Sequence, residues 1–144
     1  MKKSKSDNWG TPLQLFHAAC EHFKVKPELD VCASDTNHKC WDYITEEQNA
    51  FSRNWNKDFF MNCPFSQAKH WIQYAYQQHR KFNVNGLCLL ASRTDTQAWH
   101  RYIFNDSNCE VLFLEGRIHY LDENNIASKN PSPFPSAFVL WRKF

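Results

Sequence analysis

Residues 86–91, Gly-Leu-Cys-Leu-Leu-Ala, form an almost continuously apolar run. A run of this kind, without polar alternation, is typical of a strand whose two faces are both covered. Two other runs have the same character, Phe-Phe-Met at 59–61 and Ala-Phe-Val-Leu-Trp at 137–141. Further short strands are expected at 28–30, 43–45 and 111–114. Buried strands need helices to cover them, so these runs predict an α/β fold.

Helical patterns lie between these strands. Apolar residues recur at helical spacing over three ranges, 13–23, 66–79 and 95–104. Thr11, Ser66 and Asp95 stand where helix caps are expected, and Pro12 suits a first helical position. Strands that alternate with helices predict a largely parallel, twisted sheet with helices on both faces.

The length of 144 residues fits one domain. The net charge is only +2, so bulk charge does not point to a nucleic-acid partner. Lys2, Lys3 and Lys5 make residues 1–8 a basic arm that we expect to be flexible. No apolar run approaches the roughly 18 residues that a membrane span needs, so we expect a soluble chain without a membrane partner.

Six cysteines are scattered along the chain, with no C-x-x-C pair and no signal peptide before them. This pattern indicates free thiols in a reducing cytoplasm. His38 and Cys40 do not match the ligand spacing of a zinc site, so no metal is expected.

The run at 59–61 leads into Asn62-Cys63-Pro64-Phe65, at the expected carboxyl end of a strand, where α/β sheets bind ligands. The exocyclic amino group of adenine or cytosine is a poor nucleophile, because its lone pair is delocalised into the ring. The side-chain oxygen of Asn62 and the backbone carbonyl of Cys63 are suited to accept its two hydrogens and to localise the lone pair. Pro64 restricts the backbone of Cys63, and Phe65 supplies a ring that stacks on the base.

The tetrapeptide resembles the N-P-P-Y/F motif of S-adenosylmethionine-dependent amino-methyltransferases. Segments along nearly the whole chain resemble the phage Dam-like DNA N-6-adenine methyltransferase family: Trp9-Gly10-Thr11-Pro12, Leu29-Asp30-Val31-Cys32-Ala33-Ser34, Asn37 with Lys39 and Cys40, Tyr43 with Thr45, Trp55, Trp71-Ile72, Thr94-Asp95-Thr96 and Gly116-Arg117-Ile118. The resemblance implies a small Rossmann-like methyltransferase fold, with one catalytic domain over residues 9–144 and no separate target-recognition domain. It also implies methyl transfer to the N6 amino group of a flipped adenine in DNA.

The same resemblance implies a site for S-adenosylmethionine, which leaves as S-adenosylhomocysteine. The residues it assigns to the cofactor are Trp9, Thr11, Pro12, Asp30, Cys32, Ala33, Ser34 and Thr45. Trp9, Thr11 and Pro12 would close over the methionine end, and Asp30 would face its amino-acid group. The acid that holds the ribose hydroxyls is left open among Asp42, Glu46 and Glu47.

For the DNA partner, expected to be double-stranded, we expect Ser66, Arg93 and Arg117 to lie at the interface, where an arginine can neutralise a phosphate. Any short target sequence would be read by the loop at 122–136. Phage or prophage origin, and action in the host cytoplasm, are implied by the resemblance alone.

Several alternatives stay open at this point. The same chemistry would serve cytosine N4, an RNA base or a glutamine amide as the acceptor. The cofactor loop at 32–34 lacks the usual glycines, so a catalytically inactive module that binds cofactor or DNA is a second class of function. Cys63 as a covalent nucleophile is disfavoured, because cytosine C5 methyltransferases place proline before cysteine. The oligomeric state is not indicated.

Overall fold

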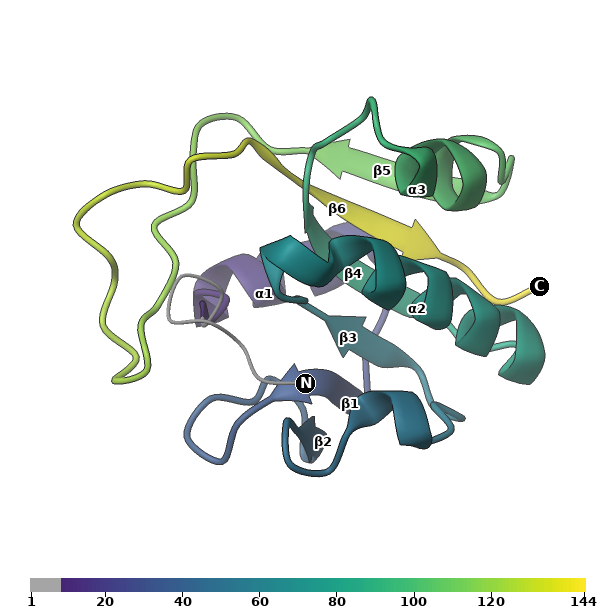
Figure 1. The fold of residues 1–144 in the computed structure, drawn as a ribbon, viewed down its shortest axis with the longest axis horizontal. Helices are drawn as coiled ribbons and strands as arrows, with labels where there is room; N and C mark the ends of the chain where they lie inside the picture. Colours follow the sequence, from purple (N-terminus) through teal and green to yellow (C-terminus); the bar gives the residue numbers. More distant parts are fainter. Residues whose placement is uncertain (1–8) are drawn as a thin grey trace.

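The fold is known from a computed structural model that describes residues 9–144, so the basic arm expected at 1–8 lies outside the described residues. One six-stranded sheet has the order β2-β1-β3-β4-β6-β5 (Figure 1). The strands are β1 (Leu29–Ala33), β2 (Asp42–Thr45), β3 (Phe59–Met61), β4 (Gly86–Ala91), β5 (Cys109–Phe113) and β6 (Ser136–Trp141). The α/β class predicted from the sequence is confirmed.

Four neighbouring strands of the sheet run parallel to one another. β1 pairs in parallel with both β2 and β3, and β3 pairs in parallel with β4. The last strand, β6, is inserted antiparallel between β4 and β5. The carboxyl ends of β1 to β4 therefore meet at one edge of the sheet, and the segments that follow these strands are brought together there.

Helices cover both faces of the sheet. The long helices are α1 (Leu13–Phe23) and α2 (Ala68–Phe82), and the short α3 (Gln97–Trp99) continues into a π-helical turn, η4 (His100–Phe104). Two 3₁₀ turns, η2 (Ala50–Ser52) and η3 (Phe65–Gln67), complete the set of helical elements among residues 9–144. In Figure 1, α1 lies behind the sheet and α2 with α3 in front of it.

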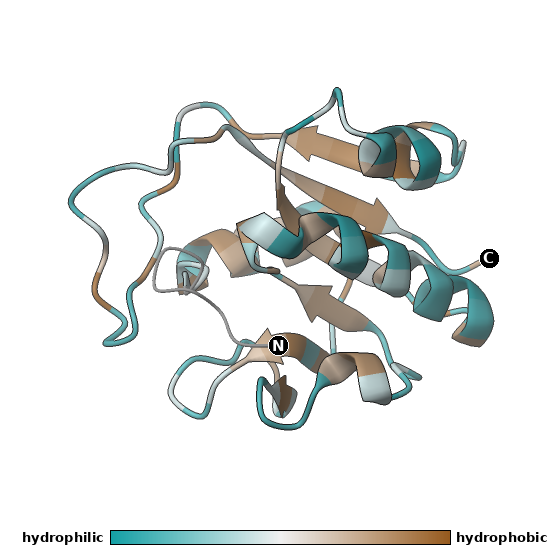
Figure 2. Cartoon of the chain, in the orientation of Figure 1, coloured by the Kyte–Doolittle hydropathy of each residue, from teal (hydrophilic) through white to brown (hydrophobic). Residues whose placement is uncertain are grey.

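Alternation along the strands divides the core into two clusters. Leu87 and Leu89 of β4 pack with α1, whereas Cys88 and Leu90 pack with α2 and α3. Figure 2 shows the strands as the apolar centre of the molecule, with the polar residues of α2 turned outward. Both faces are thus buried, as the unbroken apolar run of β4 predicts.

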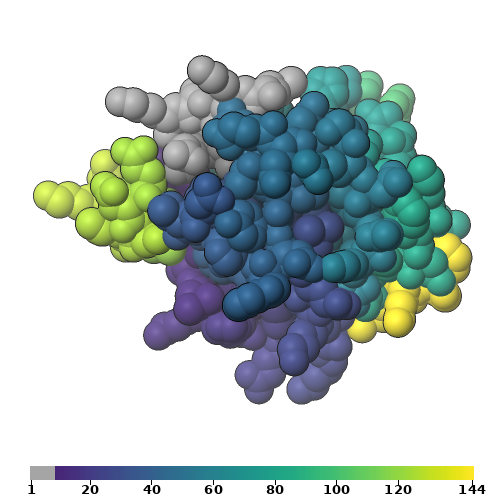
Figure 3. Space-filling model, turned by 90° about the horizontal axis from the view of Figure 1, so that it is seen from below, coloured from purple at the N-terminus to yellow at the C-terminus, as the bar shows by residue number. Residues whose placement is uncertain are grey.

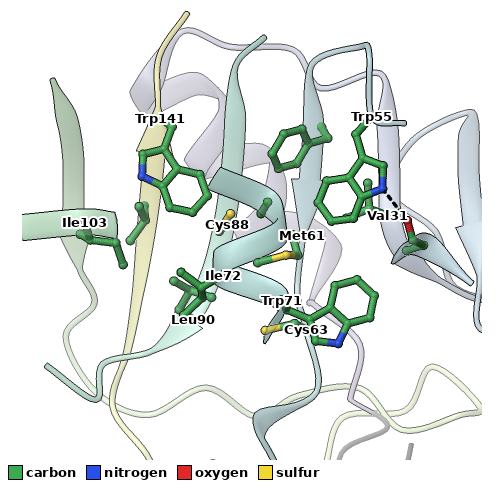
Figure 4. Close-up of a cluster of buried hydrophobic side chains, with 14 of the residues drawn as sticks. Val31, Trp55, Met61, Cys63, Trp71, Ile72, Cys88, Leu90, Ile103 and Trp141 are labelled. Carbon is green, nitrogen blue, oxygen red and sulfur yellow. Dashed lines mark hydrogen bonds between the residues drawn. The ribbon is translucent and has the colours of Figure 1, made fainter. Parts of the chain in front are cut away.

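The cluster under α2 holds four of the six tryptophans of the chain, Trp55, Trp71, Trp99 and Trp141, and Figure 4 labels three of them, Trp55, Trp71 and Trp141. Trp55 Nε1 donates to the carbonyl oxygen of Ala50 at 3.1 Å, and Trp141 Nε1 donates to that of Tyr102 at 2.8 Å. These bonds satisfy two buried indole N–H groups. Trp71 is different, because its Nε1 has no hydrogen-bond partner among residues 9–144.

Two predictions about helix caps and one about a strand were wrong. α2 begins at Ala68 after the 3₁₀ turn η3, so Ser66 does not cap it. The side chain of Thr96, rather than Asp95, accepts the backbone N–H of Trp99 at the start of α3. β1 continues to Ala33 rather than ending near Asp30, because the buried Asp30 carboxylate is satisfied by backbone amides.

The start of α1 also differs from the prediction. Pro12 occupies the position before the first helical residue, and no side chain caps this helix. Thr11 is almost fully buried, and its hydroxyl accepts a hydrogen bond from Asn62. The residue expected to cap a helix therefore belongs to the site at the end of β3.

Candidate active site

Asn62 is the first residue after β3 and is only 8% exposed. Its Nδ2 donates to the backbone oxygen of Trp9 at 3.2 Å and to Thr11 Oγ1 at 2.9 Å. A backbone carbonyl can only accept, so the contact with Trp9 fixes which end of the carboxamide is the nitrogen. Within residues 9–144, no hydrogen bond reaches Asn62 Oδ1. The carboxamide is thus held by its nitrogen, and its oxygen is left to accept.

A cavity of about 140 Å³ lies beside Asn62, and we call it the Asn62 cavity. Its walls come from the segment before α1, the end of β1 and the loop after it, β3, and the connection between β5 and β6. The lining residues are Trp9, Gly10, Thr11, Asp30, Cys32, Ala33, Ser34, Thr36, Asn37, Lys39, Phe60, Asn62, Asp122 and Glu123. Six of the eight residues expected at the cofactor are among them; Pro12 and Thr45 are not.

Both acidic and basic side chains line this cavity. The buried carboxylate of Asp30 accepts the backbone N–H groups of Cys32 at 3.2 Å and Lys39 at 2.8 Å. The Lys39 side chain is half-buried, and its Nζ donates to Asn37 Oδ1 at 2.6 Å. Burial lowers the pKa of Lys39 from its usual value, and the nearby Asp30 carboxylate opposes that shift.

A second, narrow cavity of about 20 Å³ lies at the carboxyl end of β2, and we call it the β2-end cavity. It shares Cys32 and Ala33 with the Asn62 cavity, so the two meet at the end of β1. Its further lining residues are Val31, Ile44, Thr45, Glu46, Asn49, Ala50, Phe51, Pro64 and Trp71. Thr45, which the sequence assigns to the cofactor, and the orphan N–H donor Trp71 both belong to this cavity.

The three acids left open for the ribose hydroxyls are now distinguished. Asp42 begins β2, at the opposite end of that strand, where its carboxylate pairs with the ammonium of Lys57. Glu47 lines neither the Asn62 cavity nor the β2-end cavity. Glu46 follows β2 directly and lines the β2-end cavity, so it is the candidate that the geometry favours.

On the other side of the tetrapeptide lies a larger cavity of about 380 Å³, the Phe65 cavity. Its lining residues are Cys63, Phe65, Ser66, Ala68, Lys69, Ile72, Leu89, Leu90, Ala91, Arg93, Thr96, Gln97, Ala98 and Trp99. Of the three residues expected to contact DNA, Ser66 and Arg93 line it together with Phe65. Arg117 does not, because its Nη1 donates to the backbone oxygens of Ser132 at 3.3 Å and Pro133 at 2.7 Å.

Residues that the sequence analysis did not identify come from the connection between β5 and β6, residues 114–135, which we call the strap. Phe134 of the strap packs on Phe65 with ring centroids 5.7 Å apart, and the Arg93 guanidinium lies 5.3 Å from the Phe134 ring. Tyr120 packs on Phe65 at the same centroid distance of 5.7 Å. Burial raises the pKa of Tyr120 to about 12, so its hydroxyl stays protonated near neutral pH.

The strap also forms hydrogen bonds to residues that line the Asn62 cavity. Leu121 exchanges two backbone hydrogen bonds of 2.8 Å with Gly10, and Asn125 Nδ2 donates to the Thr36 oxygen at 2.9 Å. In Figure 3, the yellow-green strap lies beside the blue segment that follows β1. Asp122 and Glu123 of the strap thereby reach the cavity wall. No local sequence pattern foretells this, because the contacts join segments far apart in the chain.

Burial keeps two of the thiols, Cys20 and Cys40, in the unreactive protonated form. Burial raises the pKa of Cys20 to about 11 and that of Cys40 to about 12, so both thiols stay protonated at neutral pH. Across residues 9–144, no group of three or more histidine, cysteine or acidic side chains is placed to hold a metal ion. Over the same residues, no helix combines the length and apolarity that crossing a bilayer requires.

The parallel strands of this α/β sheet bring a fixed carboxamide and adjoining cavities to their carboxyl edge. Enzymes that bind a cofactor at that edge have this architecture. The family model described as DNA N-6-adenine-methyltransferase (Dam) matches residues 1–144, and the chain belongs to this family. The family predicted from the sequence is confirmed, and the class of enzyme is that of DNA adenine-N6 methyltransferases.

Two curated relatives carry the same description. A DNA N-6-adenine-methyltransferase of Haemophilus phage HP1 is 29% identical over 141 residues, which cover 97% of this chain and 81% of the relative. A DNA N-6-adenine-methyltransferase of Escherichia phage T1 is 26% identical over 133 residues, which cover 90% of this chain. The match spans only 54% of the T1 protein, so this chain corresponds to about half of it.

Proposed function

We propose that the chain transfers the methyl group of S-adenosylmethionine to the N6 amino group of an adenine flipped out of double-stranded DNA, leaving S-adenosylhomocysteine. The observation that carries the proposal is the orientation of Asn62: its Nδ2 is bound to Trp9 and Thr11, and its Oδ1 is available. A preoriented oxygen is what the chemistry needs, because an acceptor that must first rotate costs reorganisation energy at the moment of reaction.

The residues of the tetrapeptide have distinct roles in this account. Asn62 Oδ1 and the Cys63 carbonyl accept the two amino hydrogens, draw the nitrogen toward tetrahedral geometry and stabilise the positive charge that develops on it. Pro64 restricts the backbone of Cys63 and so helps to direct that carbonyl. After transfer the nitrogen carries an acidic proton that leaves to solvent, so no general base is required.

The flipped base is assigned to the Phe65 cavity. Phe65 stacks on one face of the adenine, and the apolar walls from Leu89, Ala91 and Trp99 exclude water. In this proposal Ser66 and Arg93, which line the same cavity, contact the DNA backbone, where each neutralised phosphate makes binding more sensitive to salt. Arg117 is less suited to contact a phosphate, because its guanidinium already donates to two backbone carbonyls of the strap.

The cavities fit the cofactor, which supplies an electrophilic sulfonium methyl group when bound. Its amino-acid end carries a positive ammonium and a negative carboxylate. The Asn62 cavity has side chains of the opposite charges, Asp30 and Lys39, to bind them. Its adenosine end would lie in the β2-end cavity, with Glu46 at the ribose hydroxyls and the unsatisfied Trp71 N–H donating to a ring nitrogen. In the Asn62 cavity the cofactor contacts Trp9, Thr11, Cys32, Ala33 and Ser34. In the β2-end cavity it contacts Thr45. Pro12 lines neither cavity and only positions Thr11.

Two further features are part of the proposal. The antiparallel insertion of β6 between β4 and β5 supports a Rossmann-like methyltransferase fold for residues 9–144 as one catalytic domain. The phage relatives support a phage or prophage origin, with action on DNA in the host cytoplasm.

The test is transfer of labelled methyl from S-adenosylmethionine to unmethylated double-stranded DNA, followed by digestion and separation of the nucleosides. We predict label in N6-methyl-2′-deoxyadenosine. Label in N4-methylcytosine would keep the roles of Asn62 and Phe65 but overturn the acceptor. Cofactor binding without any label on DNA would contradict the enzymatic proposal and leave an inactive binding module.

A further inference from the structure

Among the described residues 9–144, Lys39 is the one cation on the wall of the Asn62 cavity. Its side chain is half-buried, and burial lowers its pKa. Nζ has a single hydrogen-bond acceptor among residues 9–144, the neutral Asn37 Oδ1 at 2.6 Å. The ion pairs within that part of the chain involve other residues, namely Lys57 with Asp42 and Arg142 with Glu110.

This arrangement leaves the ammonium short of partners. A lysine ammonium has three N–H donors, and a charge removed from water is costly unless it is paired and hydrogen-bonded. Lys39 uses one donor on a neutral oxygen, and the Asp30 carboxylate near it is committed to the backbone N–H groups of Cys32 and of Lys39 itself. The remaining donors are available for an anion that enters the cavity.

The position of the ammonium is set by close packing. Lys39 is held by Asn37, and the Asn37 carboxamide lies against Gly10, where an added Cβ would approach Asn37 Nδ2 to 1.8 Å. Only glycine at position 10 leaves room for this carboxamide. Gly10 is in turn bound to Leu121 of the strap. Lys39 Nζ is therefore directed by a chain of contacts rather than free to turn to solvent.

We infer that Lys39 binds the α-carboxylate of the amino-acid end of the cofactor. The inference rests on the proposed function, since it assigns a recognition role within the same cofactor site. Acids at Asp30, Asp122 and Glu123 line the same cavity and suit the α-ammonium, so the wall carries the charge pattern of a zwitterion. Lys39 would then select ligands that carry the amino-acid group and would orient the cofactor relative to Asn62.

The experiment compares two ligands by calorimetry. S-adenosylhomocysteine carries the amino-acid group, whereas 5′-methylthioadenosine has the same thioether and nucleoside without it. For Lys39→Met we expect the affinity for S-adenosylhomocysteine to fall roughly 10- to 100-fold, as for loss of one hydrogen bond between charged groups. The affinity for 5′-methylthioadenosine should stay within about twofold of the native value, because that ligand cannot reach Lys39.

Lys39→Arg and Lys57→Met serve as controls. Arginine keeps the charge and should recover part of the lost affinity, and Lys57, at the far end of β2, should have no effect on either ligand. An unchanged affinity for S-adenosylhomocysteine in Lys39→Met would overturn the inference, and so would an equal loss for both ligands. If the native chain binds neither ligand, the cofactor site of the proposed function fails with it, which is a distinct result.

Discussion

Asn62 and Thr11, which are 51 positions apart in the sequence, are joined by a hydrogen bond of 2.9 Å between Nδ2 and Oγ1. Both residues are buried. The segment that precedes α1 and the loop that follows β3 therefore act as one structural unit. In the proposed mechanism, Asn62 carries the chemistry and Thr11 fixes the orientation of its carboxamide.

Thr11→Val tests this link. Valine keeps the shape of threonine but removes the acceptor, so a buried N–H of Asn62 loses one partner, at a cost of about 1–3 kcal/mol. With the carboxamide less firmly held, we expect single-turnover methyl transfer to slow roughly 10- to 100-fold. Thr11→Ser retains the hydroxyl and should stay near the native rate. A native rate in Thr11→Val would show that the bond does not matter for catalysis.

Phe65→Leu separates base stacking from cofactor binding. Stacking of one base on an aromatic ring contributes about 1–3 kcal/mol, so the KM for DNA should rise roughly 5- to 100-fold. The affinity for S-adenosylhomocysteine should not change, because Phe65 lines the other cavity. Fluorescence of 2-aminopurine at the target position measures base extrusion directly. If the two proteins extrude the base to the same extent, Phe65 is not part of the base pocket.

Trp71→Phe addresses the adenosine end of the cofactor. The indole N–H of Trp71 has no partner within residues 9–144, and we expect it to bond to the ligand. Loss of one neutral hydrogen bond should weaken both S-adenosylhomocysteine and 5′-methylthioadenosine, by roughly 3- to 10-fold each. This pattern differs from that of Lys39→Met, which affects only one of them. Unchanged affinities, measured by calorimetry, would place the indole outside the cofactor site.

His79 should make stability depend on pH. It is 2% exposed, its Nδ1 donates to the Val84 carbonyl at 2.7 Å, and burial lowers its pKa below the usual 6.5. The hydrogen bond to Val84 and nearby Asp106 oppose this shift, and Arg80 adds to it. Because the folded pKa is the lower one, the stabilisation is complete above pH 6.5 and is lost as pH falls toward the folded pKa.

The check is the melting temperature of the native chain and of His79→Gln between about pH 8 and pH 5. The native chain should lose stability more steeply below the unfolded pKa than the variant, which has no proton to bind at this position. Parallel curves for the two proteins would mean that His79 does not titrate differently in the folded state.

The sequence was sufficient for the strands that carry the site. The apolar runs at 59–61 and 86–91 coincide with β3 and β4, because strands buried on both faces leave an unambiguous pattern. β1 was predicted too short, since Asp30 resembles the end of a strand until its backbone partners are known. Tertiary contacts override local propensity at such positions.

The residues of the proposed site divide in the same way. The sequence could suggest Asn62 and Phe65 because their proposed chemistry is contained in four consecutive residues. It could not suggest the roles proposed for Phe134 and Lys39, since these depend on how the strap and the loop after β1 pack at the two cavities. Arg117 was predicted to contact DNA because of its charge. In the structure its guanidinium donates to the backbone oxygens of Ser132 and Pro133.

We propose above that Asn62 Oδ1 accepts a hydrogen bond from the adenine amino group during transfer. The most direct measurement is the single-turnover rate of label transfer to N6 of adenine by Asn62→Ala, with Asn108→Ala, an exposed asparagine, as the control. We predict a fall of roughly 10²- to 10³-fold in rate, as for removal of one preorganised hydrogen-bonding group, with S-adenosylhomocysteine affinity and fold retained. A rate within a few-fold of the native one in a folded Asn62→Ala protein would contradict the account.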